Sequence, residues 1–599
     1  MIDRARRIFR TWAAATALSA VLGGVARGGP AAEPDASPFG SNVHVFDPSM
    51  PASEIERTAS AIYAKMEANQ FGPERHALLF KPGSYDVSFK VGFYTHVAGL
   101  GRHPDDVKIN GGVNVDAKWL PDGNATCNFW RTLENFCVTP LATKGVTRIA
   151  VSQAAPLRRL HIKGDLHLFD FDAKWNAGWA SGGFLADSIV DGKVVPASQQ
   201  QWLSRNSRWS EWGNGVWNMV FVGCENAPAG RFPEPPYTVV DRAPVIREKP
   251  YLTIDAAGRY AVAVPSLRTN AKGVSWAVGA GPGPGTSIPI DRFTIARPGT
   301  STAATLNAAL AAGRHILFTP GIYPLDEALR VTRPGTILLG LGVPSLVPTR
   351  GRSAIAVDDV DGVTIAGLIV DAGPVKSANL VEVGPPGSSA DHSANPTFLY
   401  DLTVRTGGAT PGKNDVGLAI RSNHAVVDQV WLWRADHGEG AGWDTNPTRN
   451  GLVVDGRDVT IYGLFNEHHE GYQTLWNGEG GLVYFYQSEL PYDVPDQSSW
   501  MSGKADGYAS YKVADRVTRH EAWGLGVYAY FRDSAVKASR AIEAPEAPGV
   551  KFHNMTTIWL NGRAGSEITH IINDAGGRVS ANSPPDAMRQ TLREFPAPR

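Results

Sequence analysis

The sequence predicts an all-β protein built from two right-handed parallel β-helices in tandem, each with an N-terminal capping helix. Three observations indicate this architecture: the composition, an internal repeat, and a run of short strand-like segments. Charged residues make up 19% of the 599 residues, while Gly (64) and Pro (42) are abundant. Because soluble proteins typically contain ~25% charged residues, this mixture favours many short strands joined by tight turns over helical bundles.

An internal repeat organises the chain. The segment LLFKPGSY at 78–85 is matched by ILFTPGIY at 316–323, and VAGLG at 97–101 is matched by LLGLG at 338–342. Two matches in the same order indicate a duplicated unit of strand, Pro-Gly turn, strand and Gly-rich corner.

A helical stretch precedes each copy of this unit, over residues 52–65 in the first half and 303–312 in the second. A helix in this position would cover the open N-terminal end of a stack of β-helix coils, whose unpaired strand edge otherwise invites association. Each half of the chain is therefore expected to begin with a capping helix.

Short β segments follow each copy at intervals that suit the coils of a solenoid. β-branched and aromatic residues dominate them, and Asp-Gly, Asn-Gly or Gly-Arg turns separate them. Strand-turn-strand units without intervening helices predict parallel β-helices, whereas a β-sandwich would need more tight hairpin signals than are present. In the second half the segments are 363–370, 425–433, 459–465, 482–487 and 550–560.

The chain divides into four predicted segments. Residues 1–37 contain a basic stretch (RARRIFR) and an apolar run that ends in small residues, which is the pattern of an export signal. Its paired arginines also suit the twin-arginine route, so Sec and twin-arginine export are both compatible. Residues 38–278 are the predicted first β-helix domain, 279–290 a Gly/Pro-rich linker, and 291–599 the second β-helix domain with most of the site. We expect a secreted or periplasmic protein with no membrane segment after signal cleavage.

Charge and cysteine content exclude several functional classes. The 57 basic and 58 acidic residues give a net charge of −1, so no basic surplus exists for binding nucleic acid. Cys127, Cys137 and Cys224 stand at spacings that match no zinc or redox motif. Cys127 and Cys137 could form a disulfide, although buried unpaired thiols are the favoured alternative. The sequence has no Gly-rich phosphate loop and no Gly-x-Ser-x-Gly elbow, and we expect no cofactor and no metal ion.

The densest group of polar and aromatic residues lies between residues 431 and 523. Glu467 and Glu489 are 22 residues apart there, which is about one β-helix coil. Adjacent coils stack ~4.8 Å apart, so these two carboxylates can project from one face. Like charges that close raise one pKa, as a general acid requires near neutral pH, and such pairs indicate glycoside cleavage. The neighbouring His468 and His469 point to opposite faces of a strand and are expected to form hydrogen bonds rather than share a metal ion.

Four motifs stand out in the two halves of the chain: Asp436-His437, Glu467-His468-His469 with Tyr472-Gln473, Gln487-Ser488-Glu489-Leu490-Pro491-Tyr492, and Gln200-Gln201-Trp202-Leu203-Ser204-Arg205-Asn206. They resemble motifs of glycoside hydrolase family 55. The resemblance implies a tandem, pectate-lyase-like β-helix enzyme that hydrolyses β-1,3-glucan in a polysaccharide or oligosaccharide, acting from a chain end with inversion. We expect a monomer, because a closed pair of solenoids needs no partner to bury its core.

The same resemblance implies catalytic roles for three residues. Glu489 is similar to the family's general acid, Glu467 to the residue that helps hold the attacking water, and Gln201 is a second support for that water; the base is left open. Because inverting pairs stand ~6.5–9.5 Å apart, the two glutamate side chains would have to splay. The implied substrate-binding residues, with Tyr472, Trp476 and Tyr492 as sugar-stacking rings, are Gln200, Asp436, His437, His468, Tyr472, Gln473, Trp476, Gln487 and Tyr492.

Alternative functions remain compatible with the sequence. A β-helix hydrolase or transferase could act on β-1,2-glucan, β-1,6-glucan, a fructan or an arabinan, and action could be endo rather than exo. A polysaccharide lyase would need basic residues or Ca²⁺ near its site, whereas the region around Glu467 and Glu489 is acidic and aromatic. A glycan-binding solenoid without catalysis would tolerate changes at both glutamates.

Overall fold

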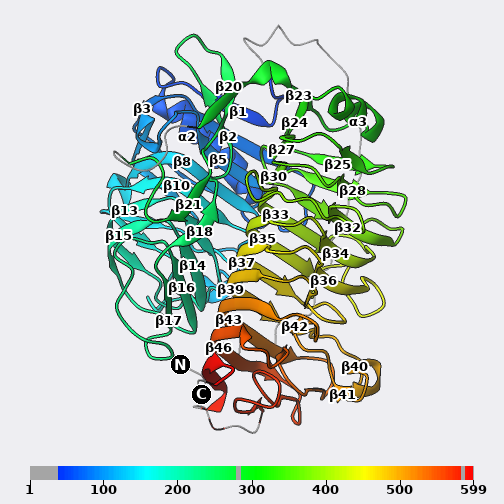
Figure 1. The fold of residues 1–599 in the computed structure, drawn as a ribbon. Coiled ribbons are helices and arrows are strands. Elements are labelled where there is room, and N and C mark those ends of the chain that lie inside the picture. Colours follow the sequence, from blue (N-terminus) through cyan, green and yellow to red (C-terminus); the bar gives the residue numbers. More distant parts are fainter. Residues whose placement is uncertain (1–37, 278–284, 582–583, 585–586, 598–599) are drawn as a thin grey trace, which may run out of the picture.

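Two stacks of mainly parallel strands stand side by side in the computed structural model, which describes residues 38–277, 285–581, 584 and 587–597 (Figure 1). The expected signal at 1–37 and residues 279–284 of the expected linker lie outside these residues. The prediction of a mostly-β chain is confirmed. The main ladder of the first stack contains β1 (Val43–Phe46), β2 (His76–Phe80), β5 (Thr95–Gly99), β8 (Arg131–Thr139), β10 (Pro156–Ile162), β12 (Phe184–Ala186), β14 (Gln201–Arg205), β16 (Asn218–Val222) and β17 (Tyr237–Val240).

A side ladder completes the coils of the first stack. Its strands also pair in parallel, so consecutive coils lie one above the other. The side strands are β3 (Gly83–Tyr85), β6 (Val107–Asn110), β9 (Val146–Arg148), β11 (Asp165–His167), β13 (Ile189–Val195) and β15 (Arg208–Trp212), beside the pair β4 (Ser88–Lys90) and β7 (Gly112–Asn114).

The second stack has a long ladder that faces the first stack and a second sheet on its other side. The long ladder contains β23 (Phe293–Ala296), β24 (His315–Phe318), β27 (Ile337–Gly340), β30 (Thr364–Ala366), β33 (Phe398–Thr406), β35 (Val426–Arg434), β37 (Thr460–Glu467), β39 (Gly481–Glu489), β43 (Arg519–Phe531) and β46 (Gly549–Gly562), closed by the antiparallel β49 (Arg589–Phe595). The second sheet contains β26 (Leu329–Val331), β29 (Ile355–Val357), β32 (Ser377–Val383), β34 (Asn414–Ile420), β36 (Thr448–Val454), β38 (Thr474–Trp476), β42 (Tyr511–Val513) and β45 (Ile542–Glu543), and the short strands β25 (Ile322–Leu325), β28 (Ser345–Pro348) and β31 (Ile369–Asp371) flank the long ladder.

Both expected helices are present, each within one residue of its predicted ends. Helix α2 (Ala52–Met66) buries Ile55, Ala59 and Ile62 at helical spacing. Helix α3 (Ala303–Ala311) begins at Thr302, whose hydroxyl accepts a hydrogen bond from the Thr305 amide. No helix among the described residues is long and apolar enough to cross a membrane.

The internal repeat is a structural repeat down to individual hydrogen bonds. In the first copy the Tyr85 hydroxyl donates to the carbonyl oxygens of Lys81, 2.8 Å away, and Phe46, 3.0 Å away. In the second, the Tyr323 hydroxyl donates to those of Thr319 at 2.8 Å and Ala296 at 2.9 Å. Each tyrosine thus ties the Pro-Gly turn of one strand to the end of the strand before it.

We expect Tyr323→Phe to lower the free energy of unfolding by roughly 0.5–1.5 kcal/mol, because the hydrogen bonds of this hydroxyl are lost while the ring is kept and the Ala296 carbonyl retains its donors from Thr319. Tyr85→Phe should produce a loss of similar size in the other stack. Thermal or urea unfolding of both variants measures the effect. An unchanged midpoint in both would show that these hydroxyl groups do not hold the turns.

The chain segment that connects β17 to β23 does not form further coils, although the predicted first β-helix domain, 38–278, extended into it. Strand β18 (Ala243–Ile246) pairs antiparallel with β21 (Arg268–Ala271), and β19 (Tyr251–Ile254), β20 (Tyr260–Val264) and β22 (Thr286–Pro289) form a second antiparallel sheet. The described end of the expected linker is thus partly strand. These elements return the chain from β17, at the lower end of the first stack, to β23, at the upper end of the second (Figure 1).

A column of left-handed residues bends the long ladder of the second stack. One residue in, or directly after, each successive strand has a φ between 48° and 73°, and these residues lie in register. Each adds a corner that shifts the alternation of side chains: in β37, Ile461 and Leu464 point into the second stack, whereas Tyr462 and Phe465 face the first. The column consists of Gly367, Asp401, Gln429, Gly463, Phe485, Gly524 and Asn554.

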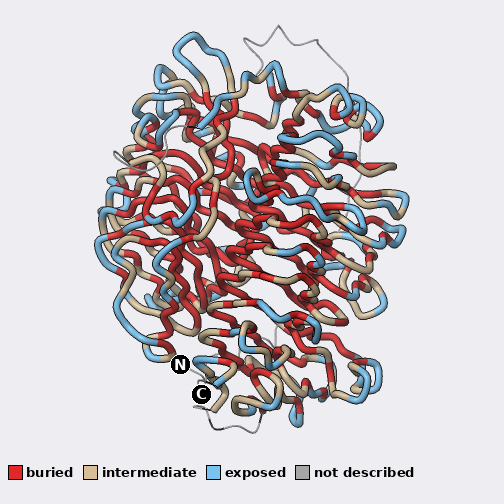
Figure 2. The backbone as a smooth tube through the Cα atoms, viewed as in Figure 1, coloured by how far each residue is buried: buried red, intermediate tan, exposed pale blue. Residues whose placement is uncertain are grey.

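Most of the backbone where the two stacks meet is buried (Figure 2), and a network of buried charges lies there. Arg158 of β10 contacts Asp401 and Asp428 of the second stack, with a closest N–O distance of 2.6 Å to each. Arg205 of β14 contacts Asp428 at 2.8 Å and Glu248 of the connecting segment at 2.6 Å. Burial acts to raise the pKa of Asp428, but Arg205 and Arg158 outweigh it and hold that pKa below its usual range.

Candidate active site

Glu467 and Glu489 end the neighbouring strands β37 and β39. Phe465 stands opposite Gln487 in this parallel pair, so the next residues on the same face are the two glutamates. The amide of His468 donates to the main-chain carbonyl of Glu489 at 2.9 Å, which continues the ladder past them. Both carboxylates therefore project from one face of the second stack, one coil apart, toward the first stack.

Glu467 is held by one donor from each stack. Its side chain is almost fully buried, with 2% exposed. Oε1 accepts a hydrogen bond from Gln153 Nε2 of the first stack at 3.0 Å, and Oε2 accepts one from Trp431 Nε1 at 2.9 Å. Burial raises the pKa of Glu467 to about 7, while the donors act in the opposite direction by stabilising the charged form.

Glu489 is half-buried and has fewer donors. Gln487 Nε2 donates to Oε1 at 3.3 Å. Burial raises the pKa of Glu489 well above its usual value, and the charges of Glu467 and Asp436 raise it further. Since two neighbouring carboxyls avoid ionising together, the negative charge belongs to Glu467, which has the better hydrogen-bond donors, and the proton to Glu489. The pair thus offers one acid and one carboxylate near neutral pH.

Asp436 and His437 stand beside this pair, just after β35. His437 Nδ1 lies 2.9 Å from Asp436 Oδ1, and His468 Nε2 lies 3.9 Å from the same oxygen. Burial acts to raise the pKa of Asp436, but the pairing with His437 outweighs it and holds that pKa well below its usual range. Asp436 therefore stays ionised and adds the negative charge that keeps Glu489 protonated. The Gln70 amide of the first stack lies 2.6 Å from His437 Nε2, so both stacks position this pair.

The first stack contributes polar side chains to the site, and the sequence predicted only some of them. The glutamine that contacts Glu467 is Gln153, which no motif marked; it stands before β10 with a positive φ of 35°. Its Oε1 lies 3.5 Å from the Ser181 hydroxyl. The predicted Gln201 lies next to this pair, because its Nε2 donates to the Ser181 carbonyl at 3.0 Å. The buried Oε1 of Gln201 accepts no hydrogen bond from any described residue.

Aromatic rings from both stacks meet beside Glu489. Tyr528 of β43 stands opposite Glu489 in the ladder. The ring of the half-buried Trp217, from the first stack, lies 5.5 Å from the Tyr528 ring with an interplanar angle of 33°. Tyr492 packs edge-on against His468 at 4.4 Å and Tyr530 at 4.8 Å. Trp217 and Tyr528 were not predicted, because single aromatic residues on separate coils carry no sequence signal that distinguishes them from core.

Three predicted binding residues do not join this group. Trp476 is 0% exposed and packs against Tyr511 and His520, so no face is free for a sugar, and its assignment as a stacking platform is wrong. Tyr472 stands shortly before β38 of the second sheet, and its hydroxyl lies 2.9 Å from Ser502 Oγ. Gln473 is fully buried and bonds both the amide and the carbonyl of His469, which closes a turn.

The remaining predicted residues have defined places. Gln487 is buried beside Glu489, whereas Gln200 is half-buried directly before β14. His468 has its pKa lowered by burial, so it is neutral and can donate from one ring nitrogen only. His469 is buried away from the pair, with Nε2 3.3 Å from the Leu432 carbonyl. Among the described residues, the one His/Cys/Asp/Glu group close enough to share an ion lies elsewhere, in the first stack.

We expect Gln153→Ala to lower kcat by about 10- to 100-fold, because a hydrogen bond to a charged group contributes about 1.5–3 kcal/mol. Since this donor favours the charged form of Glu467, its loss raises the pKa of Glu467. The acidic limb of the pH–rate profile should therefore move to higher pH. A variant with a lower kcat but an unmoved acidic limb would show that Gln153 has a packing role only.

Comparison with known proteins places this site in a family. Residues 293–489 match the LAM55 pectate lyase-like domain. The chain is 51% identical over 547 residues to an exo-β-1,3-glucanase of Streptomyces sp. strain SirexAA-E, which covers 91% of this chain and 88% of that protein. The structure of sacteLam55A from Streptomyces sp. SirexAA-E superimposes with a TM-score of 0.88 at 49% identity, over 94% of this chain and 99% of that one. A variant of sacteLam55A in complex with glucose matches equally well. The chain therefore belongs to glycoside hydrolase family 55 and is a glycoside hydrolase.

Proposed function

We propose that this protein is a secreted β-1,3-glucanase that removes sugar from chain ends with inversion, with Glu489 as the general acid. The observation that carries the proposal is the carboxyl pair at the contact of the two stacks, in which Glu489 retains its proton and Glu467 is held as a carboxylate by Gln153 and Trp431. The names of the relatives support the substrate, because the curated relative is an exo-β-1,3-glucanase and a related structure holds glucose.

In the proposed reaction Glu489 donates its proton to the glycosidic oxygen as the bond to the anomeric carbon breaks. A water molecule attacks that carbon from the opposite side. Glu467 and the unpaired Oε1 of Gln201 accept hydrogen bonds from this water and orient it, and the Glu467 carboxylate takes up the proton that the water loses as it bonds to the anomeric carbon. Asp436, ionised beside His437, keeps the acid protonated until the substrate arrives. Preorganised polar groups of this kind lower the barrier because they need no rearrangement during the reaction.

We further infer that each stack is a right-handed parallel β-helix and that α2 and α3 cap the two N-terminal ends. The parallel ladders and the position of each helix before its first full coil support this arrangement. Residues 1–37 are proposed to act as the export signal, and the mature protein to act as a secreted or periplasmic monomer.

Product analysis with the purified mature protein tests the function. Laminarin, β-1,6-glucan, β-1,2-glucan, a fructan and an arabinan are incubated separately, and products are identified by chromatography and by NMR of the freshly released anomer. We expect glucose or a short oligomer from laminarin alone, first appearing as the α-anomer. Release from another glycan would overturn the substrate, a first-formed β-anomer would overturn inversion, and unsaturated products would indicate a lyase.

A further inference from the structure

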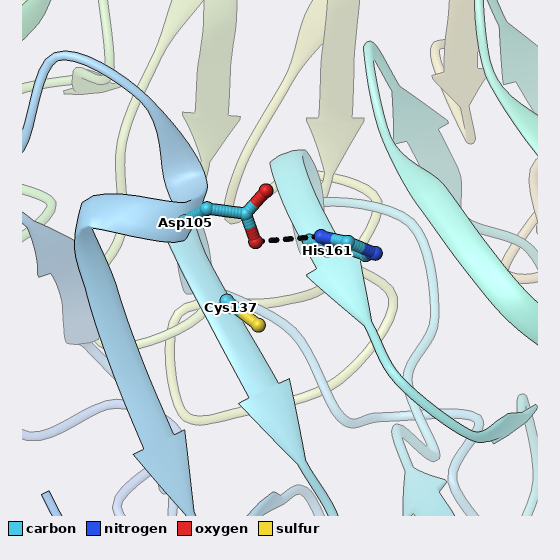
Figure 3. A group of neighbouring side chains, drawn as sticks. All are labelled: Asp105, Cys137 and His161. Carbon is cyan, nitrogen blue, oxygen red and sulfur yellow. Dashed lines mark hydrogen bonds and ion pairs between the residues drawn. The ribbon is translucent and has the colours of Figure 1, made fainter. Parts of the chain in front are cut away.

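Asp105, Cys137 and His161 form a group of potential metal ligands in the first stack, outside the carboxylate site (Figure 3). One donor atom from each residue lies within 4.8 Å of the other two. Asp105 belongs to the 3-10 turn η1 (Pro104–Asp106), Cys137 to β8, and His161 to β10. The three residues therefore come from three successive passages of the chain along the stack.

The parallel coils bring these residues together. His161 stands directly opposite Cys137 in the β8–β10 pair, and Lys108 of β6 stands opposite Cys137 on the other side. Because stacked strands are ~4.8 Å apart, side chains in register approach one another whatever their spacing in sequence. The ligands come from different coils, so their spacing in sequence matches no zinc motif. The sequence therefore showed no sign of this group, and no metal site was expected.

The surroundings of His161 match those of a metal-bound histidine. Its Nδ1 lies 2.6 Å from Asp105 Oδ1, on the side of the thiol, and its Nε2 lies 3.2 Å from Asp191 Oδ1. Histidines that bind metals usually donate their second ring N–H to a carboxylate, which fixes the tautomer and orients the other nitrogen toward the ion. The Trp276 ring, 5.8 Å away, packs beside the imidazole and restricts its rotation.

We propose that Asp105, Cys137 and His161 bind a divalent ion of the zinc class, with water as the fourth ligand. A set of one sulfur, one nitrogen and one oxygen donor suits Zn²⁺, whereas Ca²⁺ and Mg²⁺ prefer oxygen donors throughout. Cys137 is 0% exposed and supplies a rigid inner ligand, while the Asp105 side chain is 44% exposed and leaves a path for the ion and for water. Asp191 is the positioning residue behind His161.

Binding of the ion must displace the thiol proton of Cys137. The ion would also replace the proton that Asp105 and His161 share. Affinity should therefore increase with pH, because protons compete with the metal for the same atoms.

Titration of the purified protein with Co²⁺ at mildly alkaline pH tests the site. We expect one equivalent to bind with a thiolate-to-cobalt absorption band in the near ultraviolet, and Zn²⁺ to displace it. Cys137→Ser should abolish the band, whereas Cys224→Ser, which changes another buried thiol, should keep it. Asp191→Asn should retain the band but weaken binding by about 10- to 100-fold, the usual cost of losing such a partner.

Two further variants separate a metal site from a simple ion-pair cluster. His161→Gln should lose Co²⁺ binding, and Zn²⁺ should raise the melting temperature of the parent protein but not of this variant. His392→Gln is the matched control, because His392 lies between Asp359 at 2.9 Å and Asp361 at 2.6 Å with no thiol in that group. Absence of a thiolate band in the folded parent protein, or a band that survives in Cys137→Ser, would overturn the proposal.

Discussion

Glu489→Gln is expected to lower kcat on laminarin by roughly 10²–10⁴-fold, which is the contribution of a positioned general acid. Glutamine keeps the size of the side chain and its hydrogen bond with Gln487, but it has no proton to transfer to the leaving oxygen. Binding of a glucan oligomer should change little, so KM or a directly measured Kd stays within a few-fold. A substrate with a leaving group that needs no proton, such as a nitrophenyl glucoside, should restore much of the lost rate.

Glu470→Gln is the matched control for this experiment. Burial raises the pKa of Glu470 too, here to about 7, yet the Glu470 carboxylate lies 3.8 Å from Arg434 and takes no part in the Glu467–Glu489 pair. The same chemical change there should leave kcat near that of the parent protein. Equal losses in both variants, or an unrescued loss in Glu489→Gln, would show that Glu489 is not the acid.

The pH profile provides an independent check on the same residue. A general acid must be protonated, so activity falls as the pH rises through the elevated pKa of Glu489. Because the charge of Glu467 helps to raise that pKa, Glu467→Gln should move the alkaline limb of the residual activity to lower pH. An alkaline limb that does not move in this variant would contradict the electrostatic coupling of the two carboxyls.

Asp428→Asn is expected to destabilise the folded protein by about 3–5 kcal/mol, as does removal of one partner from a buried ion pair. Asp428 is fully buried and faces both Arg158 and Arg205, so its replacement leaves two guanidinium groups with less negative charge around them. The first stack, the connecting segment and the second stack all contribute to this network. Thermal unfolding measured by circular dichroism or calorimetry should show a clear decrease in the melting temperature.

Asp458→Asn provides the comparison for this stability experiment. Asp458 contacts Arg519 at 2.8 Å, but both side chains are partly solvated, at 35% and 66% exposed. Such surface pairs contribute about 0–1 kcal/mol, so this variant should unfold almost like the parent protein. If the two variants unfolded alike, the buried network would not be what joins the stacks.

Much of the fold could be predicted from local patterns. The periodicity of residues 52–65 and 303–312 predicted both helices, and the two PGxY turns predicted the repeat whose tyrosines make equivalent hydrogen bonds. The antiparallel segment between the stacks was not predicted, because its short strands resemble β-helix strands in composition. Whether a strand is parallel or antiparallel depends on the strand with which it pairs, and the composition of the strand does not show this.

The candidate site was predictable where its residues share a motif. The spacing of Glu467 and Glu489 was informative because one coil of a β-helix returns the chain to the same face. Trp476 shows the limit of that reasoning. It belongs to the same motif region, but side chains alternate between the two faces of β38, and the Trp476 ring lies on the face that packs into the core. Gln153 and Trp217 had no motif at all and enter the site only because the two stacks face each other.

By itself, the sequence determined the mostly-β composition, the duplication, the two helices and the carboxyl pair, because each depends on residues close together or one coil apart. The tertiary structure decided which stack faces which, and therefore the donors to Glu467, the buried charges around Asp428, and the grouping of Asp105, Cys137 and His161. The physical reason is that lateral packing of two solenoids and the register of their coils depend on surfaces assembled from distant segments. No local pattern in the chain records that contact.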